Sequence, residues 1–558
     1  MKQSNTCLCA SPILRALLPI VLCAALLSSA IVGAQDYVGH QAAPSVRAPP
    51  SPLWTAPVET RVQEATARPL AELSAKELAR LEAMLTAEVQ NTVDQQTRIP
   101  GQDQIITVRV RYNRKTDEVD IDLGQGYIPR GAIAVTEDLS DKLREVSNTV
   151  YDLLDGIFSY RFINEQFGGK DISDFFDELK KPAQGNKNYK RGPSTQEPAP
   201  VVLSPAHGWY FHYGSVNSRV LQRPSETNGI LEDLLTPAYA IELGNELSSR
   251  NDGDITFISS TRSLYDTSVN SESGKPWNHM AARYYLKRLL PDRTDIWNAY
   301  PNGTRPNRLA LREYDEDIAS RPRFADYLSA GALLSLHTNA SSNLAARGTQ
   351  IYVSKSSRAS VDLGNHLLCF MKEVIRAQPG YEDWRVDNSV RAGSYGENAA
   401  AAPAVIVEIG FHSNQADAAA LKDPAFRQAS MKGIAKGYQM HKRGNPCQHF
   451  QVDGIADTTG PQNTSVPVAV HYRGFPRFPV RATVKFLTCP SGWTCATFTR
   501  TFHSEQSSPL GYDHRCNTSG SSHPTSTFRI RTTLTDADNV QAVSEYAWTC
   551  TSPVNPAP

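Results

Sequence analysis

Three nearly uninterrupted apolar runs in the middle of the chain most constrain its fold. They are PVVLSPAHG (residues 200–208), GALLSLHTNA (331–340) and AVIVEIGFHSN (404–414). Apolar runs of this length are typical of strands buried on both faces of a sheet. The helix-like segments Ala238–Leu247 and Val361–Arg376 supply the crossover connections that such a sheet needs. We therefore predict an α/β domain over residues 201–445, a mixed twisted sheet with helices on both faces.

Each run carries a side chain suited to chemistry near its end: His207, His337 and Glu408. Ligands of open α/β sheets bind beyond the carboxyl ends of the strands, so these side chains should face one rim. Two imidazoles and a carboxylate with one open position form a common catalytic zinc set, and a further carboxylate can act as base. Taken singly, each residue also has a structural explanation, such as a loop histidine or a charge-paired strand residue.

These motifs together resemble the zinc-dependent N-acetylmuramoyl-L-alanine amidases, the Amidase_3 type of peptidoglycan hydrolase. SPAHG is similar to the family's DPGHGG-like turn, SLHTNA to its S-[IL]-H-x-N-A motif, and VIVEIGFHSN to its [VL]-E-x-G-F-x-[ST]-N signature. Arg262, at the end of SSTR, stands where the family has a strand-end TR. The chain departs from the family at Ser204, Ala206 and Trp209, which replace Asp, Gly and Gly. The two glycine replacements constrain the backbone of the turn.

The resemblance implies one Zn²⁺ ion held by His207, Glu232 and His337, with Glu408 as the catalytic carboxylate. Glu232 is the first residue of a helix-like segment with the family's spacing. A carboxylate at that position can also be explained by its favourable interaction with the helix dipole. Glu226 is a rival second ligand, but only Glu232 opens the apolar-periodic helix. We expect Glu408 to take a proton from the attacking water and deliver it to the departing nitrogen.

The substrate bond implied by the resemblance is the amide between N-acetylmuramic acid and L-alanine of the peptidoglycan stem. Two alternatives stay open: a zinc carboxypeptidase or peptidase acting on cell-wall peptides, and a non-catalytic cell-wall-binding relative. His412 is either a substrate contact or a loop histidine. Asn339 and Asn414 are expected to fix turns through side-chain hydrogen bonds to the backbone.

The stretch between Arg262 and Ser335 is long for the family. Its tail, NRLALREYDEDIASRPRFADYL (residues 307–328), is interpreted either as a surface insertion or as a segment that gates the cleft. Gating predicts that deletion of Arg312–Arg323 raises activity.

The N-terminus predicts export. Residues 1–34 combine basic residues, the apolar run 16–32 and small residues at Val32-Gly33-Ala34, which is typical of a secretory signal peptide. An uncleaved anchor is the alternative, because the run is near the lower length limit for a membrane span. Residues 35–60 are a Pro-rich linker, and no later stretch predicts a membrane insertion. The expected location is periplasmic or secreted.

Two further domains flank the α/β domain. Residues 61–180 predict an α+β unit of unknown role: a helix capped by Ser74 and Glu77, a hairpin over 104–127, and a helix over Asp141–Phe158. Residues 181–200 are a second linker. Residues 451–558 contain alternating β-branched and aromatic runs that predict an all-β sandwich.

The charge balance limits the classes of partner that the chain could bind, and the cysteine content indicates the compartment in which it folds. Lys+Arg and Asp+Glu both number 57, which gives no support for binding nucleic acid or an anionic membrane. Peptidoglycan is the implied partner, and the flanking domains could bind the wall or a protein activator. Outside the signal peptide the cysteines are 369, 447, 489, 495, 516 and 550. The last four predict disulfides of undetermined pairing rather than a metal site, because the short CxxC spacing of zinc ribbons is missing.

Overall fold

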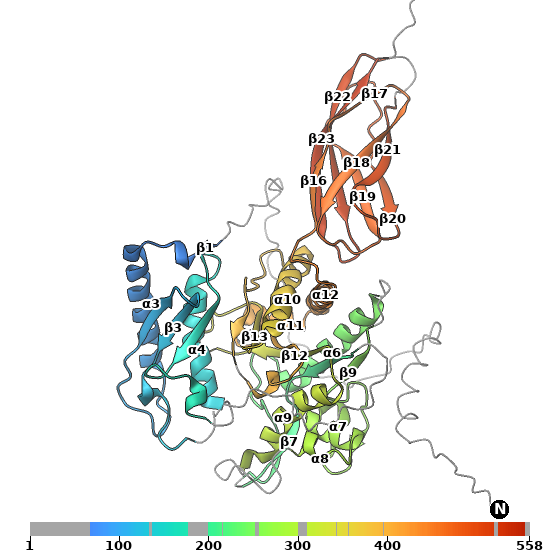
Figure 1. The fold of residues 1–558 in the computed structure, drawn as a ribbon. Helices are drawn as coiled ribbons and strands as arrows, with labels where there is room; N and C mark the ends of the chain where they lie inside the picture. The colour runs from blue at the N-terminus through green and yellow to red at the C-terminus, as the bar shows by residue number, and fades with distance from the viewer. Residues whose placement is uncertain are drawn as a thin grey trace, which may run out of the picture. The chain divides into compact units, whose positions relative to one another are not determined.

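A computed structural model gives the fold of the chain (Figure 1). It describes residues 67–132, 137–176, 199–214, 216–250, 256–298, 310–341, 343–354, 356–393, 395–517 and 523–552. The predicted signal peptide and Pro-rich linker, and residues 181–198 of the second predicted linker, lie outside these ranges. Among the described residues, no helix has the length and hydropathy needed to cross a membrane.

Residues 68–176 form a small sheet packed against two helices, α3 (Ala75–Gln95) and α4 (Glu137–Leu154). The capping box predicted at the start of α3 is present, because Ser74 accepts from the Glu77 amide and Glu77 accepts from the Ser74 amide. The predicted hairpin is formed by β2 and β3, and β5 adds a parallel third strand. The other elements are short. The bounds are β1 Arg68–Pro69, η2 Leu70–Glu72, β2 Arg109–Asn113, β3 Glu118–Asp122, η3 Gln125–Tyr127, β4 Phe158–Ser159, β5 Phe162–Gln166 and η4 Ile172–Asp174.

The second helix of this unit ends earlier than its sequence pattern indicates. The prediction placed its end at Phe158, whereas α4 ends at Leu154 and Phe158 begins β4. Gly156 has a φ of 71°, a left-handed conformation that an ordinary helical residue does not adopt. The apolar residues after the turn continue the helical spacing by coincidence, and this explains the error.

The predicted α/β domain contains a six-stranded mixed sheet with the order β14-β13-β15-β12-β6-β9. The three apolar runs form its central strands β6, β12 and β15, which are mutually parallel as predicted. Strand β13 runs antiparallel to β15 and makes the sheet mixed. The bounds are β6 Val201–Pro205, β9 Ile258–Ser260, β12 Ala332–Asn339, β13 Gln350–Val353, β14 Arg391–Ala392 and β15 Ala404–Phe411.

Helices cover both faces of this sheet, as the sequence predicts (Figure 1). Side chains alternate across a strand, so Val201 and Leu203 face one layer while Val202 faces the other. The first layer consists of α6, α10, α11 and α12, and the second of α7, α8 and α9. The bounds are α6 Glu232–Ser249, α7 Ala282–Leu289, α8 Thr294–Trp297, α9 Arg312–Tyr327, α10 Arg358–Ala377, α11 Gln415–Lys422 and α12 Pro424–Lys442.

The segment interpreted as a surface insertion or a gate is the helix α9. Ten of its side chains are buried, including Phe324, which packs on Leu333 of the central strand β12. The surface-insertion interpretation is therefore wrong, because α9 is a core element of the second helical layer. Its carboxylates and guanidinium groups misled the prediction, since charged residues are usually exposed.

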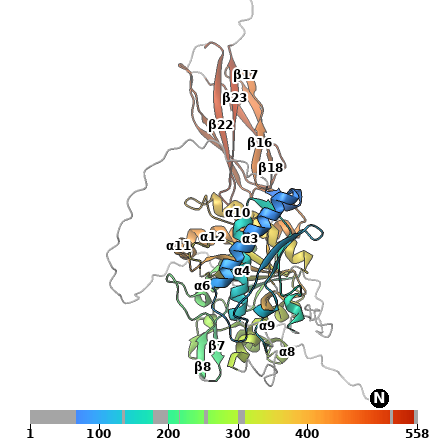
Figure 2. The same cartoon turned by 90° about the vertical axis from the view of Figure 1, so that its left-hand side faces the viewer.

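Smaller elements lie beside the sheet. The hairpin formed by β7 and β8 follows β6 (Figure 2). Strand β7 packs against α9. The bounds are β7 Trp209–His212, β8 Ser218–Leu221, β10 Val269–Asn270, β11 Lys275–Pro276, η5 Trp277–His279 and η7 Gly396–Asn398.

Residues 451–552 contain a three-stranded sheet, β16-β18-β21, and a five-stranded sheet, β17-β23-β22-β19-β20. Buried side chains of both sheets, including Val470 and Ile530, share one hydrophobic core. The bounds are β16 Gln451–Ile455, β17 Thr458–Pro461, β18 Ser465–Arg473, β19 Val480–Phe486, β20 Phe498–Phe502, β21 Leu510–Arg515, β22 Ser526–Thr535 and β23 Gln541–Thr551.

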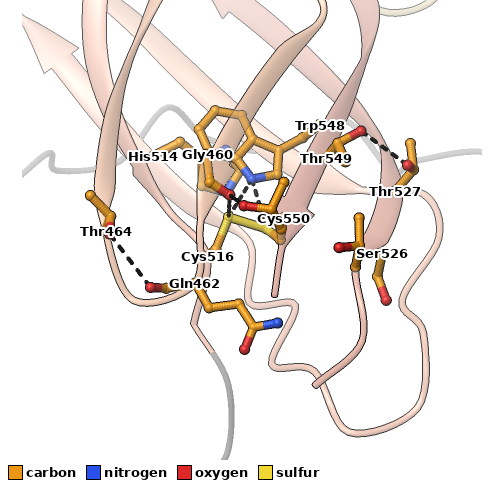
Figure 3. The surroundings of a disulfide bond; sticks show 12 residues. Gly460, Gln462, Thr464, His514, Cys516, Ser526, Thr527, Trp548, Thr549 and Cys550 are labelled. Carbon is orange, nitrogen blue, oxygen red and sulfur yellow. Dashed lines mark hydrogen bonds between the residues drawn. A yellow bond between two sulfur atoms is a disulfide. The ribbon is translucent and has the colours of Figure 1, made fainter. Parts of the chain in front are cut away.

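All six cysteines of the described residues form disulfides, which confirms the prediction of disulfides over a metal site. The pairs are Cys369–Cys447, Cys489–Cys495 and Cys516–Cys550. Figure 3 shows the last pair beside Trp548, whose Nε1 lies 2.8 Å from one sulfur and 2.9 Å from the other. This disulfide joins the two sheets, because Cys516 follows β21 and Cys550 lies in β23.

Candidate metal and catalytic centre

The structure brings His207, Glu232 and His337 together in one buried cluster. One donor atom of each lies within 4.8 Å of the others. Glu232 stands between the imidazoles, with Oε2 3.5 Å from His207 Nε2 and Oε1 3.1 Å from His337 Nδ1. The three side chains are only 4%, 4% and 6% exposed. Two imidazoles and a carboxylate that converge on one point form a donor set suited to zinc.

His207 lies in a tight turn after β6. Its own φ is 50° and that of Gly208 is 123°. A Cβ at Gly208 would lie 2.7 Å from the amide nitrogen of Ala281, so only glycine fits there. The replacements Ala206 and Trp209 leave this one required glycine in place, which explains how the altered motif still forms the turn.

Arg262 connects the start of this turn to segments that are distant in the sequence. Its buried guanidinium donates to the backbone carbonyls of Met280 (3.0 Å), Asn278 (3.0 Å) and Asp233 (3.1 Å), and also to that of Ala206. A buried carbonyl left without a partner costs about 1–3 kcal/mol, so these hydrogen bonds stabilise the chain around the turn. The strand-end arginine of the sequence motif is thus a structural support of the first histidine rather than a ligand.

Glu232 is the first residue of α6, where a carboxylate interacts favourably with the helix dipole. Its Oε1 also accepts a 3.0 Å hydrogen bond from the Thr338 amide. Burial raises the pKa of Glu232, but the charges and hydrogen bonds of His207 and His337 have the larger, opposite effect. The pKa of Glu232 is therefore well below its usual range. The rival ligand Glu226 is exposed and lies outside the cluster.

His337 and Glu408 lie opposite each other on the neighbouring parallel strands β12 and β15. Both lie in the second halves of their strands, near the ends of the apolar runs as predicted. Glu408 is 6% exposed, and its Oε2 has no hydrogen-bond partner among the residues that the structure describes. Burial raises the pKa of Glu408 above its ordinary value, although His337 and Arg144 act in the opposite direction. A buried carboxylate with a free oxygen and a raised pKa is suited to proton transfer.

The outer nitrogens of the two histidines also have partners. His207 Nδ1 lies 2.9 Å from Gln222 Oε1, and His337 Nε2 lies 2.7 Å from Glu397 Oε2. Metal-binding histidines characteristically donate their second N–H to such acceptors, which fixes the tautomer and the ring orientation. The nitrogens left for a metal are then His207 Nε2 and His337 Nδ1, the two that face Glu232. The residues present therefore fit a zinc ion.

Gln222 and Glu397 were missed by the sequence analysis. Gln222 follows the short strand β8, and Glu397 lies in the 3₁₀ turn η7. Neither belongs to a motif or to a periodic segment, so their sequence contexts contain no signal that could have identified them.

Arg144 on α4 also reaches this region from the N-terminal unit. Its Nη1 donates to Asn339 Oδ1 at 3.2 Å, and its positive charge interacts favourably with Glu408. On the same helix, Asn148 accepts from Tyr352 and Arg391, and the Tyr151 hydroxyl accepts from the Ala392 amide at 3.2 Å. The sequence of this unit contains no signal for this contact, because an isolated arginine on a predicted helix is normally a surface residue.

The remaining polar candidates hold loops around the centre. Asn414 caps α11 by accepting from the amides of Ala416 and Asp417, and Asn339 accepts from the Ala340 amide, which confirms their predicted roles in turns. His412 is partly buried, and its Nδ1 lies 2.9 Å from the Thr338 hydroxyl. Burial lowers the pKa of His412. His412 thus lies in a loop after β15, as one of the two alternatives expects, but it is partly buried rather than exposed.

The chain is similar to several solved structures. One is the catalytic domain of CwlV, an N-acetylmuramoyl-L-alanine amidase from Bacillus (Paenibacillus) polymyxa var. colistinus, with 18% identity over 44% of this chain and 99% of that one and a TM-score of 0.28. Another is the CwlD amidase from Clostridioides difficile, solved in complex with the GerS lipoprotein, with 17% identity over 44% and 100% and a TM-score of 0.30. A third is the amidase Ami1 from Mycobacterium abscessus, with 14% identity over 44% and 98% and a TM-score of 0.28.

No curated protein matches the chain. A family model does match: residues 201–439 correspond to Amidase_3, described as N-acetylmuramoyl-L-alanine amidase. The match spans the whole six-stranded sheet and every member of the buried cluster. Residues 201–439 of this chain are therefore an amidase domain of the N-acetylmuramoyl-L-alanine amidase family.

Proposed function

We propose that this domain hydrolyses the amide bond between N-acetylmuramic acid and L-alanine of peptidoglycan stem peptides, using one zinc ion held by His207, Glu232 and His337. The observation that carries the proposal is the convergence of these three buried donors beside Glu408. The same donors would serve a zinc peptidase, but the family match favours the amidase. The retained Glu408 favours an enzyme over a non-catalytic wall-binding relative.

Glu408 is the residue proposed to move protons. A bound zinc ion supplies a Lewis acid that polarises the scissile carbonyl and lowers the pKa of water to about 7. Glu408 has a free, buried oxygen that can accept the proton of the attacking water. It can then deliver this proton to the L-alanine nitrogen as the C–N bond breaks, which returns the carboxylate to its starting state.

The residues around the centre keep its groups in place. The Thr338 amide holds one oxygen of Glu232, and Gln222 and Glu397 hold the outer nitrogens of the histidines. The low exposure of the cluster limits the water near it, which strengthens every electrostatic interaction at the reacting bond.

We also propose that the protein is exported, to the periplasm or outside the cell, after removal of residues 1–34. The three disulfides support an oxidising compartment. Residues 61–180 and 451–558 would then be accessory domains, α+β and β-sandwich, joined to the catalytic domain through the linker 181–200 and the segment after residue 445. Their proposed roles are binding to the wall or to an activating protein.

Two substitutions test the assigned roles. Glu408→Ala should retain zinc and lose most turnover, whereas His337→Ala should lose the metal. The matched controls are Glu226→Ala, which removes an exposed carboxylate, and His212→Ala, which removes a histidine outside the cluster. Zinc content measured by elemental analysis and release of stem peptide together separate the two roles. Full activity of Glu408→Ala, or normal zinc content of His337→Ala, would contradict the assignment.

A further inference from the structure

Helix α9 carries a fully buried ion pair behind the metal centre. Asp317 and Arg321 lie one helical turn apart, with 2.8 Å between Arg321 Nη2 and Asp317 Oδ2, and both side chains have no exposed surface. Isolated charges are costly to bury, so a pair in this position must find further partners. The polar partners of this ion pair also contact both histidines of the cluster.

The first connection reaches His207. Asp317 Oδ2 accepts a 3.0 Å hydrogen bond from Gln222 Nε2, and Gln222 Oε1 lies 2.9 Å from His207 Nδ1. Arg321 also donates to the carbonyls of Pro205 at 3.1 Å and His207 at 3.3 Å. Since a carboxylate only accepts, Asp317 turns the amide nitrogen of Gln222 toward itself and its oxygen toward His207. The imidazole must therefore donate from Nδ1, which leaves a lone pair on Nε2.

The second connection reaches His337. Arg321 Nη1 lies 3.4 Å from Glu397 Oε2, and the same oxygen lies 2.7 Å from His337 Nε2. Glu397 also only accepts, so His337 donates from Nε2, and its Nδ1 is the nitrogen that can bind a metal. The arginine thus holds in place the acceptor that orients the second histidine.

We propose that Asp317 and Arg321 act together as positioning residues that set the tautomers and ring orientations of both metal-binding histidines. The inference rests on the proposed zinc site and adds a shared support that neither motif contains. Because one ion pair supports both ligands, damage to α9 lowers the affinity for zinc through two ligands at once. Outer partners of metal ligands typically contribute about 10–100-fold to metal affinity.

Asp317→Asn is the decisive variant. In the wild type, Asp317 Oδ1 accepts from the Arg283 amide at 2.9 Å while Oδ2 accepts from Gln222 and Arg321. An amide nitrogen placed at either position meets a donor, so the substitution removes the group that orients Gln222. Asp326→Asn is the matched control, because this aspartate lies on the same helix and its carboxylate accepts from the backbone amides of Ala401 and Ala402.

The first measurement uses the full chain without metal, labelled with ¹⁵N-histidine. Long-range ¹H–¹⁵N correlation spectra distinguish Nδ1–H from Nε2–H, and His207→Ala identifies the signal of His207. The expected result is an Nδ1–H tautomer in the wild type and in Asp326→Asn, and a mixture of tautomers or the Nε2–H form in Asp317→Asn. An unchanged tautomer in Asp317→Asn would overturn the inference.

The second measurement is zinc affinity by competition with a chromophoric chelator. Asp317→Asn should bind about 10–100-fold more weakly than the wild type, and Arg321→Lys should also bind more weakly, because a lysine cannot contact Asp317, Glu397 and both carbonyls together. Wild-type affinity in both variants would overturn the inference even if their free energies of unfolding fall. Absence of zinc binding by the wild type would instead refute the proposed function, and the tautomer measurement does not depend on it.

Discussion

Zinc binding should depend steeply on pH, because His337 holds a proton that the metal must displace. Burial lowers the pKa of this imidazole, but the nearby carboxylates of Glu397 and Glu232 have a larger, opposite effect. Together they raise the pKa of His337 to about 10. At pH 7 the imidazole is protonated with three pH units to spare, and removing that proton costs about 4 kcal/mol. The apparent zinc affinity at pH 7 should therefore be about 1000-fold weaker than that of the deprotonated site. It should rise about tenfold for each pH unit between 6.5 and 9.

Two assays measure this dependence. Chelator competition across the pH range gives the slope, and calorimetry in buffers of different ionisation enthalpy gives the number of protons released, expected to be close to one at neutral pH. Glu397→Gln is the informative variant, because it removes the strongest charge that raises the pKa of His337 and should flatten the slope. A zinc affinity that does not change with pH, with no proton released by the wild type, would refute this reasoning.

The same group affects the stability of the metal-free protein. The pKa of His337 in the folded state exceeds its ordinary value of 6.5, so protonation of this imidazole stabilises the folded state. The stabilisation is fully present below pH 6.5. That stabilisation is lost as the pH rises through about 10. Urea denaturation of the metal-free chain should show a lower free energy of unfolding at pH 9.5 than at pH 6.5, with a smaller difference in Glu397→Gln.

Three further predictions concern the fold. Gly208→Ala should lower the free energy of unfolding by about 2–4 kcal/mol, because a Cβ there would lie 2.7 Å from the Ala281 amide nitrogen in a positive-φ conformation; denaturation midpoints check this, and wild-type stability would contradict the proposed turn geometry. Replacing Cys516 and Cys550 by serine should lower the free energy of unfolding by about 1.5 kcal/mol more than the same change at the Cys489–Cys495 pair. The reason is that the sequence separation is 34 rather than 6 residues. Equal losses, measured by urea denaturation, would argue against a loop-closure origin. Deleting Arg312–Arg323 should abolish folding rather than raise activity, since α9 is a buried element. Circular dichroism and peptide release measure the two properties. A folded and more active deletion variant would support the gating interpretation.

The sequence patterns were sufficient where local chemistry decides the structure. Continuous apolar runs predicted β6, β12 and β15, and the capping residues Ser74 and Glu77 predicted the start of α3. The cluster of His207, Glu232 and His337 was also predictable, because each residue belongs to a segment with its own motif. The proximity of His207 and His337 then follows from the parallel register of β6 and β12.

The residues behind the cluster could not be predicted in the same way. Gln222, Asp317, Arg321 and Glu397 are distant in sequence, and only the packing of α9 and η7 against the sheet brings them together. Single-sequence patterns assign charged helical residues to the surface, whereas here mutual pairing makes their burial possible. Edge strands such as β14, of two residues, are too short to leave a periodic pattern.

The most direct test of the proposed function is mass spectrometry of the fragments released from purified peptidoglycan by the zinc-loaded protein, with a chelated sample as control. We predict free stem peptides that begin at L-alanine, intact glycan strands, and loss of this release on chelation. Cleavage within the stem peptide, or release that persists unchanged after the metal is removed, would contradict the assignment of a zinc-dependent muramoyl-L-alanine amidase.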